Sequence, residues 1–215
     1  MDRVNAAEIL DGDGLPDELV KRVYRDLARI HWWLGDTHCV IRAIREDPIP
    51  VRRILDVGCG IGSVIENVRD KLGVEAVGVD LKLRSSITSA VRIFQADAIR
   101  DPLPYADVAF SMHLGHHLSE GDLAALIRNV GKFCRRFILL DLVRHPLPLA
   151  LFRLFVAPFV CRIVVVDGQR SIRRSYTPAE LRRITDRALA GSGGAFRQSI
   201  APLYARQIVD IVYAR

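Results

Sequence analysis

The sequence has few of the features that mark secreted proteins, proteins with a structural metal site or membrane-spanning proteins. Its four cysteines, Cys39, Cys59, Cys134 and Cys161, form no CxxC pair and no Cys/His pairing at zinc spacing, which argues against a disulfide framework and a structural zinc site. The first residues lack the apolar run of a signal peptide. The most apolar stretch, Pro146 to Val166, is broken by arginines and prolines, so it does not predict a transmembrane helix. We therefore expect a cytoplasmic protein.

Lysine is also scarce, because 27 of the 31 basic residues are arginine. The basic excess is uneven along the chain: residues 1–143 carry a net charge of −2 and residues 144–215 carry +8. The overall charge of +6 therefore arises from the last third of the chain. By itself it does not indicate nucleic-acid binding. With 50% hydrophobic and 26% charged residues among 215, the composition excludes a disordered chain and fits one globular domain.

The first fifty residues predict two helices. Pro16 stands at a helix start, and apolar residues recur at three- and four-residue steps from Leu19 to Leu34. A second, shorter helix is predicted to begin at Asp36 and to end before Pro48. After Pro48 the spacing of the apolar residues is no longer that of a helix.

From residue 52 onward, short aliphatic runs alternate with amphipathic segments. Continuous isoleucine, leucine and valine are typical of parallel strands covered on both faces, and crossover helices are predicted at Ser63–Leu72 and Ser119–Phe133. Thr177 and Glu180 form a capping box for a further helix to about Ala190. The pattern predicts an α/β, doubly wound sheet that ends in an antiparallel hairpin. The predicted strands are Ile54–Val57, Ala76–Val79, Val91–Phe94, Val108–Met112, Phe137–Val143, Phe196–Ile200 and Gln207–Tyr213.

A glycine-rich loop, ILDVGCGIG, runs from Ile54 to Gly62 between the first strand and the first crossover helix. A doubly wound sheet binds nucleotides at this place. The dinucleotide fingerprint needs a glycine where this chain has Ser63, and Asp56 stands two residues before Gly58. A carboxylate there would oppose a pyrophosphate but suit an ammonium or sulfonium group. The loop therefore argues against NAD.

Two further carboxylates end the next two predicted strands. Asp80 follows Gly58 by 22 residues, where a carboxylate can accept hydrogen bonds from both ribose hydroxyls. Asp97 ends the third strand, where it can accept from an adenine amino group. The three carboxylates together are a more specific signal than the glycines alone.

In the order and spacing of these motifs, the chain resembles the class I S-adenosylmethionine-dependent methyltransferases. The resemblance rests on Asp56–Gly62, Gly78–Asp80, Gln95–Asp97 and residues 103–110, LPYADVAF, and it covers about residues 50–143. It implies a Rossmann-like fold with a mostly parallel seven-stranded sheet and an antiparallel C-terminal hairpin. It also implies S-adenosyl-L-methionine as the cofactor.

The resemblance further implies which residues hold that cofactor. It would lie above the glycine loop, with Asp80 on the ribose and Leu81 against the adenine. Asp97 and Ala98 would meet the adenine edge, and the backbone around Met112 would flank the methionine part. The expected cofactor-binding set is Asp56, Gly58, Cys59, Gly60, Gly62, Asp80, Leu81, Asp97, Ala98 and Met112.

Histidines dominate the segment that would face the transferred methyl group. Methyl transfer to an oxygen or nitrogen requires alignment and removal of a proton, and the residues after the fourth strand read SMHLGHH. His113, closest to the strand, is the best-placed base, with His116 and His117 as alternatives, one of which we expect to pack under the next helix. No carboxylate pattern completes a metal site with these histidines, so no metal is expected.

The regions outside the cofactor-binding motifs indicate what kind of molecule accepts the methyl group. The chain lacks the Asn/Asp-Pro-Pro-aromatic turn of nucleic-acid amino-methyltransferases and the Pro-Cys of cytosine C5 enzymes, so a nucleic-acid substrate is disfavoured. By the resemblance, residues 1–50 form a helical lid on a domain of residues 51–215, within which residues 144–176 are a substrate-side insertion. Leu147–Val166 fits an apolar acceptor wall, a bilayer contact or core packing.

We expect the arginines at positions 170, 173 and 174 in a solvated basic loop, with an acidic acceptor site as the alternative. The combined interpretation is a methyltransferase that O-methylates a small apolar or aromatic metabolite, with peripheral membrane contact as a further partner. Two alternatives stay open. One is RNA methylation, favoured only by charge, and the other is a module that binds the cofactor without catalysis. The sequence fixes no oligomeric state.

Overall fold

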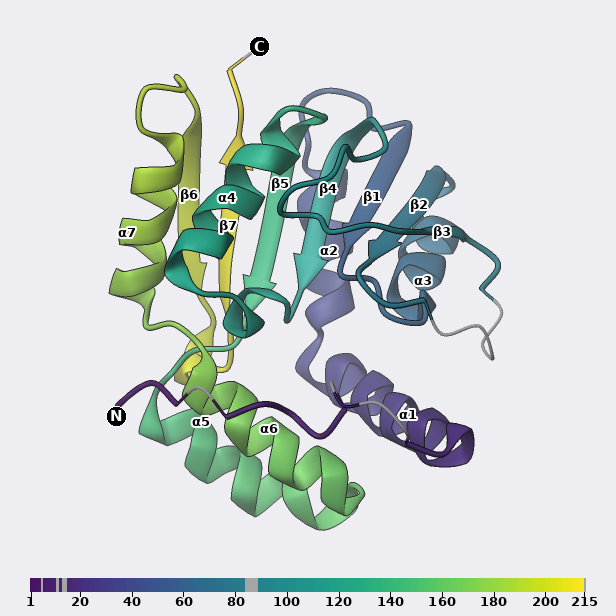
Figure 1. Cartoon of the computed structure of the whole chain (residues 1–215), viewed down its shortest axis with the longest axis vertical. Coiled ribbons are helices and arrows are strands. Elements are labelled where there is room, and N and C mark those ends of the chain that lie inside the picture. The colour runs from purple at the N-terminus through teal and green to yellow at the C-terminus, as the bar shows by residue number, and fades with distance from the viewer. Residues whose placement is uncertain (5, 11, 13–14, 84–88, 215) are drawn as a thin grey trace.

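A seven-stranded sheet in the order β3-β2-β1-β4-β5-β7-β6 forms the centre of the computed structural model (Figure 1), which describes the whole chain except residues 5, 11, 13–14, 84–88 and 215. β7 pairs antiparallel with both β5 and β6, and the other pairings are parallel. The predicted mostly parallel sheet with an antiparallel C-terminal hairpin is confirmed. The strands are β1 (Arg53–Val57), β2 (Glu75–Asp80), β3 (Arg92–Gln95), β4 (Ala106–Met112), β5 (Cys134–Asp141), β6 (Ala195–Ile200) and β7 (Gln207–Val212).

Helices cover both faces of the sheet, which explains why the central strands are apolar throughout. Leu55 and Val57 of β1 pack toward α4 (Glu120–Gly131) and α7 (Pro178–Leu189). Ile54 packs on the other face, in the core that α2 (Asp36–Arg45) and α3 (Ser63–Leu72) contribute to. Figure 1 shows α4 and α7 in front of the sheet and α2 behind it. Two cores therefore sandwich β1, β4 and β5.

The helix boundaries follow the capping residues in the sequence. The side chain of Ser119 accepts the N–H of Asp122 at the start of α4, and Thr177 with Glu180 forms the predicted capping box of α7. α1 (Asp17–Leu34) begins just after Pro16. β5 begins at Cys134, three residues before the predicted start at Phe137, because Cys134 pairs with the first residue of β4.

Residues 144–176 are helical, and the predicted basic loop is wrong. The segment forms α5 (Pro146–Leu151), a π turn η2 (Phe152–Val156), a 3-10 turn η3 (Ala157–Phe159) and α6 (Arg162–Arg174). Gly168 sits inside α6 because the ring of Phe152 leaves no room for a side chain: a Cβ at Gly168 would lie 2.5 Å from its Cζ. Asp167 accepts the N–H groups of Ile9 and Leu10. The polar residues of α6 thus hold the N-terminal segment.

The additional helices gather at one end of the sheet. In Figure 1, α1, α5 and α6 lie beyond the carboxyl ends of the parallel strands, and the N-terminal segment passes across the same end. α1 packs there on α6 through a small core of Val23, Ile30, Cys161 and Val164. Within the described ranges, no helix combines the length and apolar character that crossing a bilayer requires.

Candidate active site

Gly60 lies in the glycine loop, close to α1. Its φ of +56° lies in the left-handed region that side chains disfavour, and a Cβ there would lie 3.2 Å from the hydroxyl oxygen of Tyr24 in α1. Its N–H donates to Oδ2 of Asp80 at 2.7 Å. The loop backbone is therefore fixed between the end of β2 and the first helix.

Asp56 and Asp80 form a pair of carboxyl groups beside this loop. Asp56 is 2% exposed, and burial raises its pKa well above the usual range, with a further contribution from the charge of Asp80. Asp80 accepts the N–H groups of Gly60 and Lys82 at 2.7 and 2.9 Å. The neutral form of Asp56 is favoured until a cation approaches, so the pair is suited to a positively charged group.

Cys59 contributes backbone and packing to the loop. Its side chain is buried against Gly78, where a Cβ would lie 2.6 Å from Sγ. Burial, then the charges of Asp56 and Asp80, raise the pKa of the thiol. The thiol is therefore held in its unreactive form.

One cavity of about 1640 Å³ joins the loop to the histidines and to the helices at the end of the sheet. Leu81 is exposed and lines it, as does Met112 at the end of β4. The volume exceeds the roughly 300–1,000 Å³ of a site for one small molecule, so two ligands can lie side by side. Of the predicted cofactor set, the cavity walls include Asp56, Gly58, Cys59, Gly60, Asp80, Leu81 and Met112.

The other three predicted residues, Gly62, Asp97 and Ala98, lie outside these walls. Gly62 precedes α3, and a Cβ there would lie 2.6 Å from Oγ of Ser89. Asp97 accepts the N–H of Ile99 at 2.9 Å in the turn after β3. In this structure, these positions shape the turns that flank the cavity.

His113 belongs to a buried network around Asp36. Its Nε2 lies 3.1 Å from Oδ2 of Asp36, and Nδ1 of His31 lies 3.0 Å from the same oxygen. The two imidazole rings stack with centroids 4.7 Å apart. Arg206 donates to the second oxygen of Asp36 at 2.8 Å. Burial alone would raise the pKa of Asp36, but the hydrogen bonds from His113 and His31 outweigh it and keep the carboxylate ionised.

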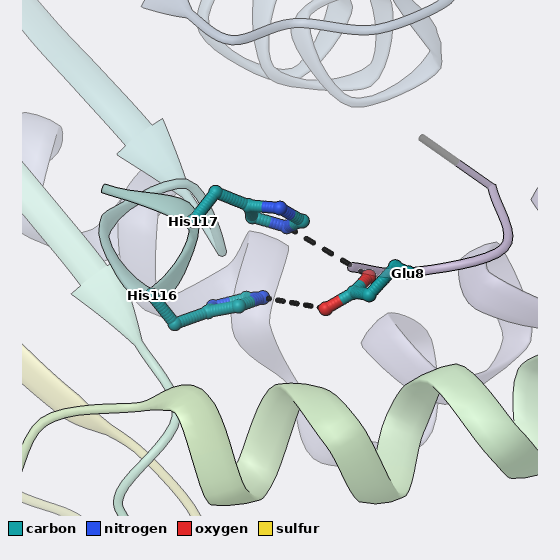
Figure 2. Close-up of side chains that lie close together, drawn as sticks. All are labelled: Glu8, His116 and His117. Atoms are coloured by element: carbon teal, nitrogen blue, oxygen red, sulfur yellow. Dashed lines mark ion pairs between the residues drawn. The ribbon is translucent and has the colours of Figure 1, made fainter. Parts of the chain in front are cut away.

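His116 is held between two carboxylates, those of Asp141 and Glu8, of which Figure 2 shows Glu8. Its Nδ1 lies 2.7 Å from Oδ1 of Asp141, and its Nε2 lies 3.5 Å from Oε1 of Glu8. Burial alone would lower the pKa of His116, but Asp141 and then Glu8 raise it to about 9. His116 is therefore an imidazolium near neutral pH, with both ring nitrogens facing a negative charge. This geometry favours a structural role over that of a base.

His117 lies beside His116 and points toward the same carboxylate. Figure 2 shows both histidines, from the turn after β4, directed at Glu8 of the N-terminal segment. Nε2 of His117 lies 3.8 Å from Oε2 of Glu8, and the side chain of His117 is 24% exposed. Both His113 and His117 line the cavity. The neighbouring carboxylate is Asp36 for His113 and Glu8 for His117.

Each histidine group has the composition of a metal site: Glu8, His116 and His117 form one, and His31, Asp36 and His113 form the other. The expectation that carboxylates are missing near the histidines is therefore wrong. Protein cations already lie close to both carboxylates, however: Arg206 on Asp36, and Arg174 with its Nη1 3.9 Å from Glu8. Both groups are consistent with internally balanced ion pairs.

Glu8, Asp36, Asp141 and Arg206 were not anticipated from the sequence. Asp141 ends β5 next to β4, so the strand-end rule that selected Asp80 and Asp97 would have found it. Asp36 looked like an ordinary first residue of a helix, and Glu8 lies in a segment without helix or strand. For these two residues no local pattern signals the contact.

Comparison with known proteins gives one family, and solved structures that share the fold. A family model described as a methyltransferase domain matches residues 30–149. A search of curated proteins finds no match. Similar solved structures include the plantazolicin methyltransferase BpumL in complex with SAH, with a TM-score of 0.72 and 11% identity over 96% of this chain and 93% of that chain.

Two further structures are similar. The plantazolicin methyltransferase BamL, in complex with a triazolic desmethylPZN analog and SAH, has a TM-score of 0.70 and 14% identity, over 92% of this chain and 91% of that chain. Human N-acetylserotonin methyltransferase in complex with SAM has a TM-score of 0.62 and 14% identity, over 98% of this chain and 64% of that chain. At these identities the likeness concerns the fold.

Proposed function

The chain belongs to the methyltransferase-domain family, and from that premise we propose that it uses S-adenosylmethionine to methylate an oxygen of a small apolar, aromatic metabolite. The observation that carries the proposal is the continuous cavity of about 1640 Å³. It begins at Asp56 and Asp80, passes His113 and ends among apolar side chains of α1, α5 and α6. A donor and an apolar acceptor would therefore meet beside a histidine.

The residues around the glycine loop fit the proposed donor. Asp56 is a buried carboxyl group that favours a cation, and the donor carries both a sulfonium and an ammonium group. Asp80 retains lone pairs for ribose hydroxyls beyond its two backbone hydrogen bonds. Leu81 presents an exposed apolar side chain to the cavity. Asp97 and Ala98 remain proposed adenine contacts, although neither lines the cavity.

Transfer requires in-line alignment and loss of the acceptor proton. When bound, the donor would supply an activated methyl group, with the S–CH₃ bond broken as the O–CH₃ bond forms and the electron pair left on sulfur. His113 takes the proton of the acceptor hydroxyl. Asp36 accepts from Nε2 of His113, which leaves the Nδ1 lone pair as the basic site. Nδ1 makes no hydrogen bond within the described chain and is covered from solvent, and Oδ1 of Asp141 lies 4.0 Å from it.

The acceptor is proposed to lie against residues 1–50 and 144–176. Leu27 and Ile30 of α1 and Leu151, Phe152 and Val156 after β5 line that part of the cavity. These side chains offer apolar contact and no anion-binding group. The N-terminal helices act as a lid, and the insertion forms the opposite wall.

RNA methylation is less well supported, because arginines of the basic last third are used inside the protein. Arg206 pairs with the buried Asp36, and the buried Arg144 pairs with Glu180. Charge paired in this way does not attract a phosphate backbone.

Calorimetry with S-adenosylmethionine, S-adenosylhomocysteine and NADH tests the proposal. We expect both adenosyl ligands to bind and Asp80→Ala to weaken them by about 1–3 kcal/mol. Asp107→Ala is the matched control, since Asp107 accepts backbone N–H groups of Arg52 and Arg53 at the opposite end of the sheet. Binding of NADH alone would refute the donor. Transfer of labelled methyl to RNA but to no phenol would refute the acceptor, and ligand binding without transfer to any acceptor would favour a non-catalytic module.

A further inference from the structure

Five large apolar side chains lie exposed on one part of the surface, which we call the aromatic patch. It consists of Trp32 and Trp33 at the end of α1 and Leu154, Phe155 and Phe159 in η2 and η3. Their exposed fractions run from 54% for Trp33 to 78% for Trp32. The rings of Trp33 and Phe159 meet edge to face with centroids 6.4 Å apart. Clustered exposed apolar groups of this size mark a binding surface more often than isolated ones do.

The aromatic patch lies at the mouth of the large cavity. Trp32 and Phe155 are members of the patch and also line the cavity. Behind them, Phe152 and Val156 continue the apolar wall inward and pack in the core between α1 and α6. Apolar side chains therefore connect the patch with the acceptor side of the cavity.

Basic residues surround the aromatic patch. On α1, Arg22, Arg25 and Arg29 are exposed at three- and four-residue steps and lead to Trp32 and Trp33 on the same helix face. Arg153 and Arg162 are exposed on the η2–η3 side. Among the acids of this region, Asp26 is buried, accepts the N–H of Cys161 and lies 3.8 Å from Nη1 of the exposed Arg29. Glu18 pairs with Lys21 near the far end of α1.

This combination fits one kind of partner. Tryptophan and phenylalanine beside arginine are the side chains of helices that lie in a membrane interface, where rings enter the acyl boundary and guanidinium groups meet anionic headgroups. An acidic protein would satisfy the arginines but would not explain a cavity that opens through the rings.

We propose that the aromatic patch docks the protein on an anionic lipid bilayer, and that the methyl acceptor is an amphipathic molecule with a long apolar tail that enters the cavity from that bilayer. The docking part stands independently, while the acceptor part rests on the proposed function and narrows its substrate class. The phenolic end reaches His113, and the tail occupies the apolar part toward Trp32 and Phe155.

Tryptophan fluorescence gives a direct test, because Trp32 and Trp33 are the only tryptophans in the chain. We expect vesicles of equal parts phosphatidylcholine and phosphatidylglycerol to shift their emission to shorter wavelength and to carry the protein upward in a flotation gradient. Vesicles of phosphatidylcholine alone should bind more weakly, and added salt should reverse the difference, since salt screens exposed charges.

Substitutions separate the apolar and basic contributions. Leu154→Gln with Phe159→Gln should weaken vesicle binding by about tenfold for each residue, and Arg25→Gln with Arg29→Gln by about fivefold for each charge. Tyr105→Gln is the matched control, because Tyr105 is equally exposed but precedes β4, at the opposite end of the sheet. Neither Leu154 nor Phe159 lines the cavity, so transfer to a water-soluble phenol should be unchanged.

The acceptor part is tested with a long-chain alkylphenol in the same vesicles and a short-chain phenol in solution. The Leu154/Phe159 variant should lose transfer to the first and keep transfer to the second. Vesicle binding by the wild type without transfer to either phenol would overturn the proposed function and leave docking supported. Unchanged emission and no flotation on anionic vesicles would overturn docking, as would a vesicle-independent emission shift that accompanies dimer formation in sedimentation.

Discussion

Nε2 of His113 lies 3.1 Å from Oδ2 of Asp36, although 77 residues separate the two in sequence. The contact joins the end of β4 to the start of α2, and Arg206 holds the other oxygen of the same carboxylate. A buried carboxylate on an imidazole fixes the ring orientation and stabilises the charge that the ring gains with a proton, which is the arrangement found in hydrolase triads.

Replacing His113 should separate binding from catalysis. His113→Gln removes the proposed base, so we expect kcat to fall by about 100-fold or more while S-adenosylhomocysteine binds as before. His145→Gln is the control, because His145 caps α5 and stacks on Tyr204 instead of lining the cavity. Full turnover in His113→Gln, with loss in His117→Gln, would assign the base to His117.

Stability should depend on pH through His116. The pKa of this group is raised from 6.5 to about 9 in the folded protein, so its contribution is complete below pH 6.5 and is lost as pH rises through 9. Urea unfolding of wild type and His116→Gln should therefore give a free-energy difference that shrinks between these pH values. A difference that stays constant would contradict the ion-pair assignment.

Two glycines with the same backbone conformation allow a matched test of the loop. Gly60 and Gly73 have φ values of +56° and +68°, but only Gly60 has a neighbour within 4 Å of the added Cβ, the ring of Tyr24. Alanine at either position should destabilise the fold by roughly 1 kcal/mol. Only Gly60→Ala should also weaken binding of the adenosyl ligands in calorimetry. Equal ligand affinity in both variants would remove Gly60 from the cofactor site.

Donor binding should release protons because of Asp56. Its raised pKa favours the neutral form in the empty site, and a cationic ligand favours the carboxylate. Affinity for S-adenosylmethionine should therefore increase with pH until Asp56 is ionised, and calorimetry in buffers of different ionisation enthalpy should show the released proton. Asp56→Asn should abolish both effects. The same pH dependence in that variant would place the cation elsewhere.

Metal removal should leave methyl transfer unchanged. The carboxylates of both histidine groups already have arginine neighbours, so no added cation is needed to balance them. We expect full activity after dialysis against EDTA, measured by label transfer. Loss of activity that one divalent metal restores, and that Glu8→Gln prevents, would instead assign a metal to Glu8, His116 and His117.

The strand ends of the site could be predicted because parallel strands deliver their last residues to one edge. Asp56, Asp80, Met112 and His113 follow directly from that rule, and the structure places all of them on the cavity. Asp97 obeys the same rule but lies in a turn off the cavity wall, because β3 is the edge strand. The position of a residue at a strand end does not reveal whether that strand lies at the edge of the sheet, away from the cavity.

The partners of the histidines could not be predicted, since they come from segments whose local sequence serves another purpose. Asp36 starts a helix, Arg206 precedes the last strand, and Glu8 lies in irregular backbone. Similarly, the sequence predicts a basic loop where the structure has α6, a helix that contains Asp167 and Gly168, two residue types with low helix propensity. Tertiary contacts explain both residues. Asp167 accepts the N–H groups of residues 9 and 10, and Gly168 lies against the ring of Phe152.

The bond between Arg206 and Asp36 spans 170 positions, and it has a consequence for how the protein is made. During synthesis, Asp36 and the helices around it leave the ribosome long before Arg206 does. Until then, the carboxylate lacks its cation, and the sheet lacks β7, which pairs on both sides. A nascent chain can therefore form the glycine loop early, but it gains a competent catalytic centre only with its last strand, so truncated products should be inactive.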